Sequence, residues 1–108
     1  MDNKTATQLF SLLGNDTRLS IFRMLIQAGD SGIRPKQMSD PLKIEPNGLS
    51  FHLNKLKELA LINHKKSGRE LIYYANYKVI EGLMDYLFKN CCNGDAKKCF
   101  NGLCNTNS

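Results

Sequence analysis

Short stretches with the helical spacing of apolar residues, each bounded by glycine or proline, constrain the fold of this chain most strongly. The first stretch starts at a capping box from Thr5 to Gln8 and stops at Gly14. Asp16 is a good N-cap for a second helix, which ends at Gly29. The sequence therefore predicts two short helices at its beginning.

Proline marks the beginning of two more helices. Pro35 suits the first position of a third helix that ends near Leu42, and Pro46 suits the first position of a fourth. Pro41 falls in the last turn of the third helix, where it removes a hydrogen-bond donor. One side of the fourth helix is apolar and carries Leu49, Leu53, Leu56 and Leu59.

The rest of the pattern predicts a β-hairpin and a last helix. Residues 61–66 and 69–75 are strand-like runs on either side of a Ser67–Gly68 turn, and residues 77–90 return to helical spacing. The apolar stripe of this last helix is wider than one small domain needs, so we expect a homodimer surface shared with the first helix. The candidate dimerisation residues are Leu9, Val79, Ile80, Leu83, Met84 and Leu87. The alternative is an ordinary core helix in a monomer.

These elements give a mainly α fold with a small β-hairpin, in the order α-α-α-α-β-β-α. Helices followed by a basic hairpin in this order form a winged helix-turn-helix. The chain has 108 residues, which is the usual length of one domain. We assign residues 3–90 to this domain and residues 91–108 to a flexible, Cys-rich tail.

Positive charge is concentrated in the middle of the chain. The net charge is +5, and residues 35–69 hold seven of the fifteen Lys and Arg residues but three of the ten Asp and Glu residues. This excess on a helix-turn-helix favours double-stranded DNA as the partner. The candidate DNA-binding residues are Asn47, Ser50, Phe51, His52, Lys55, Lys65, Lys66 and Arg69. The alternative is a solvated basic face, with His52 half-buried and hydrogen-bonded to backbone.

Several classes of protein do not fit the sequence. An apolar run of about 18 residues is missing, so we expect no membrane span. The first residues lack the apolar core of a signal peptide, which predicts a cytoplasmic location. Neither a Ser/His/Asp arrangement nor a Gly-rich phosphate loop is present, so we expect neither an enzyme nor an organic cofactor.

Thiol chemistry is confined to the end of the chain, where Cys91, Cys92, Cys99 and Cys104 are the only cysteines. Cytosolic cysteines are more often metal or redox ligands than structural disulfides, and soft ions select thiolates. Three alternatives remain for this tail. It could bind Zn²⁺ through four thiolates, act as a thiol redox switch, or be disordered and inert.

Several ordered motifs resemble the ArsR–SmtB family of metal-responsive repressors. Residues 13–22 (LGNDTRLSIF) are similar to the family's Leu-Gly-Asp-x-Thr-Arg-Leu-x-Ile segment, and residues 49–56 (LSFHLNKL) are similar to its recognition helix. Residues 59–62 (LALI) and the later Gly68-Arg69 and Tyr73-Tyr74 pairs look like its wing. The resemblance implies a homodimeric repressor that binds an inverted-repeat operator and leaves it when a metal or metalloid binds.

Two known metal sites of that family are missing from the sequence. The third helix has no Cys-x-Cys pair, and the last helix offers Glu81 and Asp85 without histidine. Pro41, and Lys43 in place of a common glycine, are further departures. The remaining cysteines resemble the branch whose arsenic site follows the last helix. That resemblance implies As(III) or Sb(III) as the inducer, bound by Cys91, Cys92 and Cys99, with Cys104 as a replacement or fourth ligand or a bystander.

The expected function is therefore an arsenic(III)- or antimony(III)-responsive transcriptional repressor. Two alternatives stay open. One is a repressor that senses oxidants through its thiols, and the other is a constitutive DNA-binding protein with a structural zinc tail.

Overall fold

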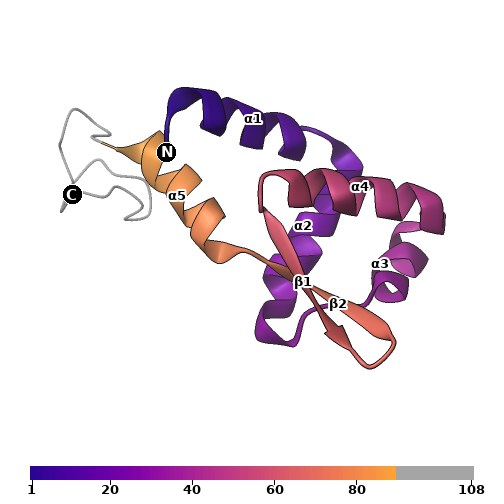
Figure 1. Cartoon of the computed structure of the whole chain (residues 1–108). Helices are drawn as coiled ribbons and strands as arrows, with labels where there is room; N and C mark the ends of the chain where they lie inside the picture. The colour runs from indigo at the N-terminus through magenta and orange to yellow at the C-terminus, as the bar shows by residue number, and fades with distance from the viewer. Residues whose placement is uncertain (90–108) are drawn as a thin grey trace.

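The computed structural model describes residues 1–89. Its elements, shown in Figure 1, are α1 (Asn3–Leu13), α2 (Asp16–Ala28), the 3-10 turn η1 (Gly29–Ser31), α3 (Pro35–Leu42), α4 (Pro46–Glu58), β1 (Ile62–Ser67), β2 (Glu70–Ala75) and α5 (Tyr77–Phe88). The expected mainly helical fold with one antiparallel hairpin is confirmed. None of the helices in the described part of the chain has the length and apolar character needed to cross a membrane.

The predicted caps of the first two helices are wrong by one or more residues. Asp2, not Thr5, caps α1, and its carboxylate accepts a hydrogen bond from the Thr5 backbone N–H at 2.8 Å. Hydrogen bonding by the Thr5 side chain first, and by its backbone N–H second, lowers the pKa of Asp2. Asn15, not Asp16, caps α2 by accepting from the Arg18 backbone N–H at 3.1 Å. In both cases a suitable side chain lies earlier in the sequence, and the helix extends back to it.

The predicted proline starts of α3 and α4 are confirmed, since Pro35 and Pro46 are their first residues. Pro41 lies inside α3, which still continues to Leu42 and ends on Lys43 in the left-handed conformation, with φ 54°. Helix α4 ends in a similar way, with Ala60 at φ 60°. Its two closing hydrogen bonds run from Ala60 N–H to the Lys57 carbonyl (3.0 Å) and from Leu61 N–H to the Leu56 carbonyl (3.1 Å), which is a Schellman motif.

The hydrophobic core takes side chains from all five α-helices and from the root of the hairpin. Helix α2 contacts α1, α3, α4 and β2. Each of the five helices contributes at least one fully buried side chain, and so does the residue before β1. These side chains are Leu9, Ile21, Leu25, Met38, Leu56, Leu61 and Leu83. The apolar side of α4 is buried at Leu49 and Leu53 as well, while Leu59 is half-buried. Burial of this side fixes which face α4 turns to solvent.

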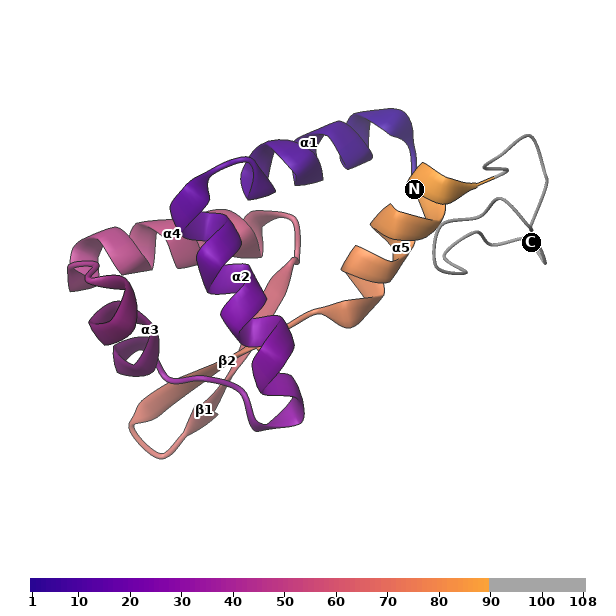
Figure 2. The same ribbon diagram turned by 180° about the vertical axis from the view of Figure 1, so that it is seen from behind.

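The hairpin pairs β1 with β2 in a register from Ile62–Ala75 at its root to Ser67–Glu70 at its tip. Ile33, which precedes α3, exchanges two backbone hydrogen bonds with Tyr73 (2.8 and 2.9 Å) and ties the hairpin to the helices. Residues from Asn63 to the tip are exposed. Seen from behind in Figure 2, the hairpin projects beyond α2 and α3 as a wing, while α1 and α5 meet at the opposite end.

Candidate nucleic-acid interface

One face of α4 is exposed and carries short polar and aromatic side chains. Asn47 and Ser50 are exposed, and 55% of the Phe51 surface is accessible. On the opposite side, Leu49 and Leu53 are buried against the core. A helix with this division presents hydrogen-bonding groups and an apolar ring to solvent, as a DNA-reading helix does.

Phe51 is part of a small aromatic and cationic cluster. The Lys55 Nζ lies 5.6 Å from the centre of the Phe51 ring, and the His52 ring meets Phe51 edge-on with centroids 5.6 Å apart. Lys55 also approaches Glu58 at 3.8 Å, one turn further along α4. These contacts restrict the side chains that α4 turns outward.

His52 is half-buried, and its partner is a side chain rather than the backbone. Its Nδ1 lies 3.4 Å from Nη1 of Arg18 on α2. The Nε of the same guanidinium donates to the Leu12 carbonyl of α1 at 2.6 Å. Burial first, and the Arg18 charge second, lower the pKa of His52. Sequence reasoning missed this role of Arg18, although the residue lies within the 13–22 motif.

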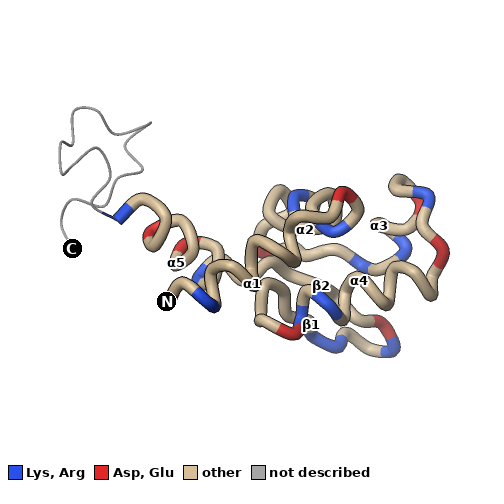
Figure 3. Tube along the Cα trace, turned by 90° about the horizontal axis from the view of Figure 1, so that it is seen from above, with Lys and Arg blue, Asp and Glu red and all other residues tan. Residues whose placement is uncertain are grey.

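Basic side chains continue from α4 onto the hairpin. Lys65, Lys66 and Arg69 are exposed along its outer half, and Lys65 Nζ lies 5.5 Å from the Tyr74 ring centre. Figure 3 shows that Lys and Arg segments gather along this hairpin. Such groups suit phosphate contacts, which position a protein on DNA without reading its sequence.

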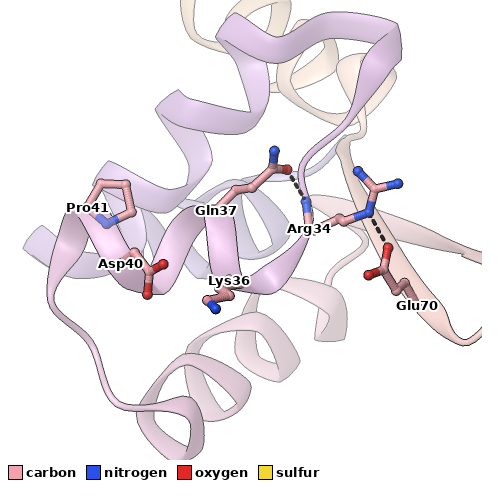
Figure 4. Close-up of a pocket in the computed structure, with 6 residues that line it drawn as sticks. All are labelled: Arg34, Lys36, Gln37, Asp40, Pro41 and Glu70. Atoms are coloured by element: carbon pink, nitrogen blue, oxygen red, sulfur yellow. Dashed lines mark hydrogen bonds and ion pairs between the residues drawn. The ribbon is translucent and has the colours of Figure 1, made fainter.

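A shallow groove of about 530 Å³ separates α3 from Glu70, at the tip end of β2. Figure 4 shows Arg34, the residue before α3, in an ion pair with Glu70 across this groove. The Arg34 backbone N–H also donates to Gln37 Oε1 at 2.9 Å, and the Gln37 backbone N–H donates to the Arg34 carbonyl at 3.0 Å. Sequence reasoning did not include Arg34, because its link to Glu70 on the wing spans 36 residues.

The predicted DNA-binding residues thus lie on two neighbouring elements, α4 and the hairpin.

The candidate dimerisation residues differ in how deeply they are buried. Leu9 and Leu83 are buried inside the chain, and Leu87 is exposed. Val79, Ile80 and Met84 are half-buried. Cys91, Cys92, Cys99 and Cys104 lie outside the described residues. Within residues 1–89, His, Cys, Asp and Glu do not form a cluster of three or more that could hold a metal ion.

Comparison with known proteins agrees with this geometry. The family model for a helix-turn-helix domain matches residues 13–65. An uncharacterised HTH-type transcriptional regulator of Methanocaldococcus jannaschii is 32% identical over 69 residues, which cover 64% of this chain and 75% of that protein.

Solved structures show the same fold. An ArsR-like transcriptional regulator from Rhodococcus superposes with a TM-score of 0.68 at 24% identity, over 78% of this chain and 76% of its own. HlyU from Vibrio cholerae superposes with a TM-score of 0.64 at 26% identity, over 82% and 98% of the two chains. Reduced HlyU gives 0.63 at 26% identity, over 79% and 90%.

The relatives are transcriptional regulators and not enzymes, in agreement with the expectation from sequence. The expected winged helix-turn-helix is confirmed by the fold that the chain shares with them. The chain therefore belongs to the helix-turn-helix transcriptional regulators and has the winged-helix fold of the ArsR-like and HlyU proteins.

Proposed function

We propose that the protein represses transcription by binding an inverted-repeat operator as a homodimer, with α4 of each protomer in a major groove. The observation that carries this proposal is the exposed face of α4, where Asn47, Ser50 and Phe51 stand opposite the buried leucines. In a dimer, two such helices would lie about 34 Å apart, one turn of DNA.

Helix α4 and the wing make different kinds of contact with the DNA. Asn47 and Ser50 have the donors and acceptors that base edges recognise, and the ring of Phe51 suits a thymine methyl group. Lys65, Lys66 and Arg69 on the wing contact phosphates or the minor groove. Each phosphate contact makes the affinity more dependent on salt concentration, whereas the base contacts determine the sequence preference.

Selection of duplexes from a randomised pool, followed by titration of variants, tests this division. Ser50→Ala should reduce discrimination between the selected and a scrambled duplex by about tenfold or more, because one base contact is lost. Lys66→Ala should weaken binding to both duplexes equally and lower the salt slope by about one. Lys78→Ala removes the same charge from α5 and serves as control. Equal behaviour of all three variants would contradict the proposal.

The homodimer is supported by the apolar residues left at the α1–α5 end. Tyr86 Oη donates to Asn3 Oδ1 at 3.1 Å, so the two helices already pack together in one chain. Leu87 nevertheless keeps 55% of its surface exposed, and Val79, Ile80 and Met84 are half-buried beside it on α5. A second copy of the chain would cover this apolar surface.

For the inducer we propose As(III) or Sb(III), bound by the thiolates of Cys91, Cys92 and Cys99. The support is the sequence, since two adjacent cysteines follow shortly after α5, which ends at Phe88, and a third lies seven residues later. Three thiolates match the preference of these soft ions. Cys104 is a fourth ligand, a replacement for Cys99 or a bystander. Free thiols suit the cytoplasmic location expected from the sequence.

Binding at the end of α5 acts as a switch when the inducer favours a dimer geometry with lower operator affinity. A coupling of about 1–3 kcal/mol would lower that affinity by one to two decades. The test is titration of the operator complex with arsenite, antimonite and Zn²⁺ under reducing conditions, and with peroxide separately. Cys91→Ser and Cys92→Ser should keep operator binding and lose release by arsenite. Release of these variants by arsenite would overturn the assignment.

The second candidate is a thiol redox switch. One of the similar structures is described as reduced HlyU, and the same cysteines could be oxidised here. Release by peroxide but not by arsenite would favour this candidate. Operator binding that ignores all four additions would instead favour a constitutive regulator.

A further inference from the structure

A single guanidinium joins the end of α1 to the recognition helix. Arg18 lies in the first turn of α2, where its backbone N–H is held by Asn15. Its side chain reaches in two directions, with Nε at 2.6 Å from the Leu12 carbonyl and Nη1 at 3.4 Å from His52 Nδ1. Leu12 lies in the last turn of α1, where carbonyls lack a partner inside the helix. Arg18 thus contacts α1 and α4 from α2.

This contact determines which ring nitrogen of His52 carries the proton. A guanidinium has N–H donors and no acceptor, so the nitrogen that faces it must accept. Nδ1 therefore has a lone pair, and the proton of the neutral ring is on Nε2. Protonation of Nδ1 would place two N–H groups and two positive charges against each other. The half-buried position of the ring opposes its charged form as well.

The position of His52 along α4 places this ring beside the exposed face of the helix. His52 lies three residues after Leu49 and four before Leu56, both of which are buried, and next to the exposed Phe51. The ring is therefore at the border between the core and the face that carries Asn47 and Ser50. Among the described residues, the ring makes its hydrogen-bond contact with Arg18 through Nδ1 and not through Nε2.

We propose that Arg18 is a positioning residue that holds His52 as the Nε2–H tautomer, so that α4 presents one fixed donor to an acceptor on a base edge. The acceptors open to such a donor in the major groove are guanine N7 and O6, adenine N7 and thymine O4. The base contact rests on the proposed operator binding, whereas the tautomer belongs to the protein alone. Because Arg18 is also tied to α1, the donor is fixed before DNA arrives.

Lysine is not an adequate replacement for Arg18. Its ammonium group is a point charge on a flexible stem, whereas the planar guanidinium presents Nε and Nη1 in a rigid fork. That fork matches two acceptors on different helices at once. Arg18→Lys should therefore give the same mixture of His52 tautomers as Arg18→Met, even though the positive charge is retained.

The first arm of the test needs no DNA. Long-range ¹H–¹⁵N spectra of the full chain report which ring nitrogen of each histidine is protonated. His52 should show the Nε2–H pattern in the wild type and in Arg23→Met, a change at an exposed position of the same helix, and a mixture of tautomers in Arg18→Met. His64, on the hairpin, should not change in any variant and is the internal control. An Nδ1–H pattern for wild-type His52 overturns the proposal.

The second arm uses the duplex that the wild type selects from a randomised pool, with a scrambled duplex beside it. His52→Asn should reduce discrimination at one base position by about tenfold, and His52→Gln, whose amide nitrogen reaches the place of Nε2, should retain most of it. Combining Arg18→Met with His52→Asn should add little to either change alone.

The outcomes separate this inference from the proposed function. If the wild type selects no duplex, operator binding and the base contact fail together, and the spectra still decide the tautomer. If the wild type selects a site but His52→Asn keeps its full discrimination, the inference fails and operator binding stands. If Arg18→Met does not fold, the Asn and Gln variants of His52 decide the base contact.

Discussion

The guanidinium of Arg34 forms an ion pair with the carboxylate of Glu70, and this contact joins the start of α3 to the tip end of β2 in the wing (Figure 4). Both side chains are about half exposed, so the pair contributes little to stability, on the order of 0–1 kcal/mol. Its larger effect is electrostatic. Together with Asp40, Glu70 offsets the positive charges of Arg34 and Lys36 in the groove, next to a surface that we expect to meet phosphates.

Glu70→Gln should therefore bind DNA more tightly. The substitution removes a negative charge and releases Arg34, so affinity for a scrambled duplex should rise, and the slope of log affinity against log salt should become steeper by about one. Fluorescence anisotropy at several salt concentrations measures both. Glu81→Gln, on the exposed side of α5, is the matched control. An unchanged salt slope in Glu70→Gln would show that this groove does not meet phosphate.

Ala60 occupies a conformation that glycine adopts more readily. At φ 60° its Cβ is strained, and the Schellman hydrogen bonds at the end of α4 hold it there. Ala60→Gly should raise the free energy of unfolding by about 0.5–1 kcal/mol. Ala28→Gly, at the helical φ of −71°, should instead lower it by up to about 1 kcal/mol. Urea titration measures both, and a loss of stability in Ala60→Gly would contradict this reading of the cap.

Stability should fall below neutral pH because of His52. Its pKa in the folded protein is lowered by burial and by Arg18, so the unfolded chain binds the proton more readily. The stability is complete above the unfolded pKa of about 6.5 and is lost as the pH falls from there toward the folded pKa. His52→Gln should remove this part of the pH dependence in urea titrations at pH 7.5 and 5.5. If wild type and variant lose the same stability between pH 7.5 and 5.5, groups other than His52 cause the loss.

Leu87→Lys should separate the dimer without unfolding the protomer. The side chain is 55% exposed in the single chain, so a charge there costs the fold little and opposes an apolar interface. Sedimentation equilibrium should give a dimer for the wild type and a monomer for the variant, with equal helix content by circular dichroism. Leu71→Lys, an exposed leucine on the hairpin, should remain dimeric. A monomeric wild type would refute the proposed dimer.

Local sequence signals predicted the elements well because they act over a few residues. Pro35 and Pro46 start helices for reasons contained in the proline ring, and Gly68 permits the hairpin turn at φ 64°. The caps were less predictable, because Thr5 and Asp16 satisfy the same rule as Asp2 and Asn15. In both helices the earlier candidate is the cap, because the residues that follow it are already helical.

The tertiary contacts could not be predicted from the sequence. Arg18 lies 34 residues from His52, and Arg34 lies 36 residues from Glu70, so no periodicity relates them. Apolar spacing likewise could not separate the core from a subunit interface. Leu83 and Leu87 share one stripe of α5, yet Leu83 is buried within the chain and Leu87 is exposed. Only the packing of α1 against α5 distinguishes them.

The central claim, that α4 and the wing bind DNA, is tested most directly by the backbone amide signals of the ¹⁵N-labelled protein as the selected duplex is added. We predict that the largest shift changes fall in residues 47–55 of α4 and 63–69 of the hairpin, with smaller changes in α5. Largest changes in α5, or equal changes with a scrambled duplex at physiological salt, would contradict the claim.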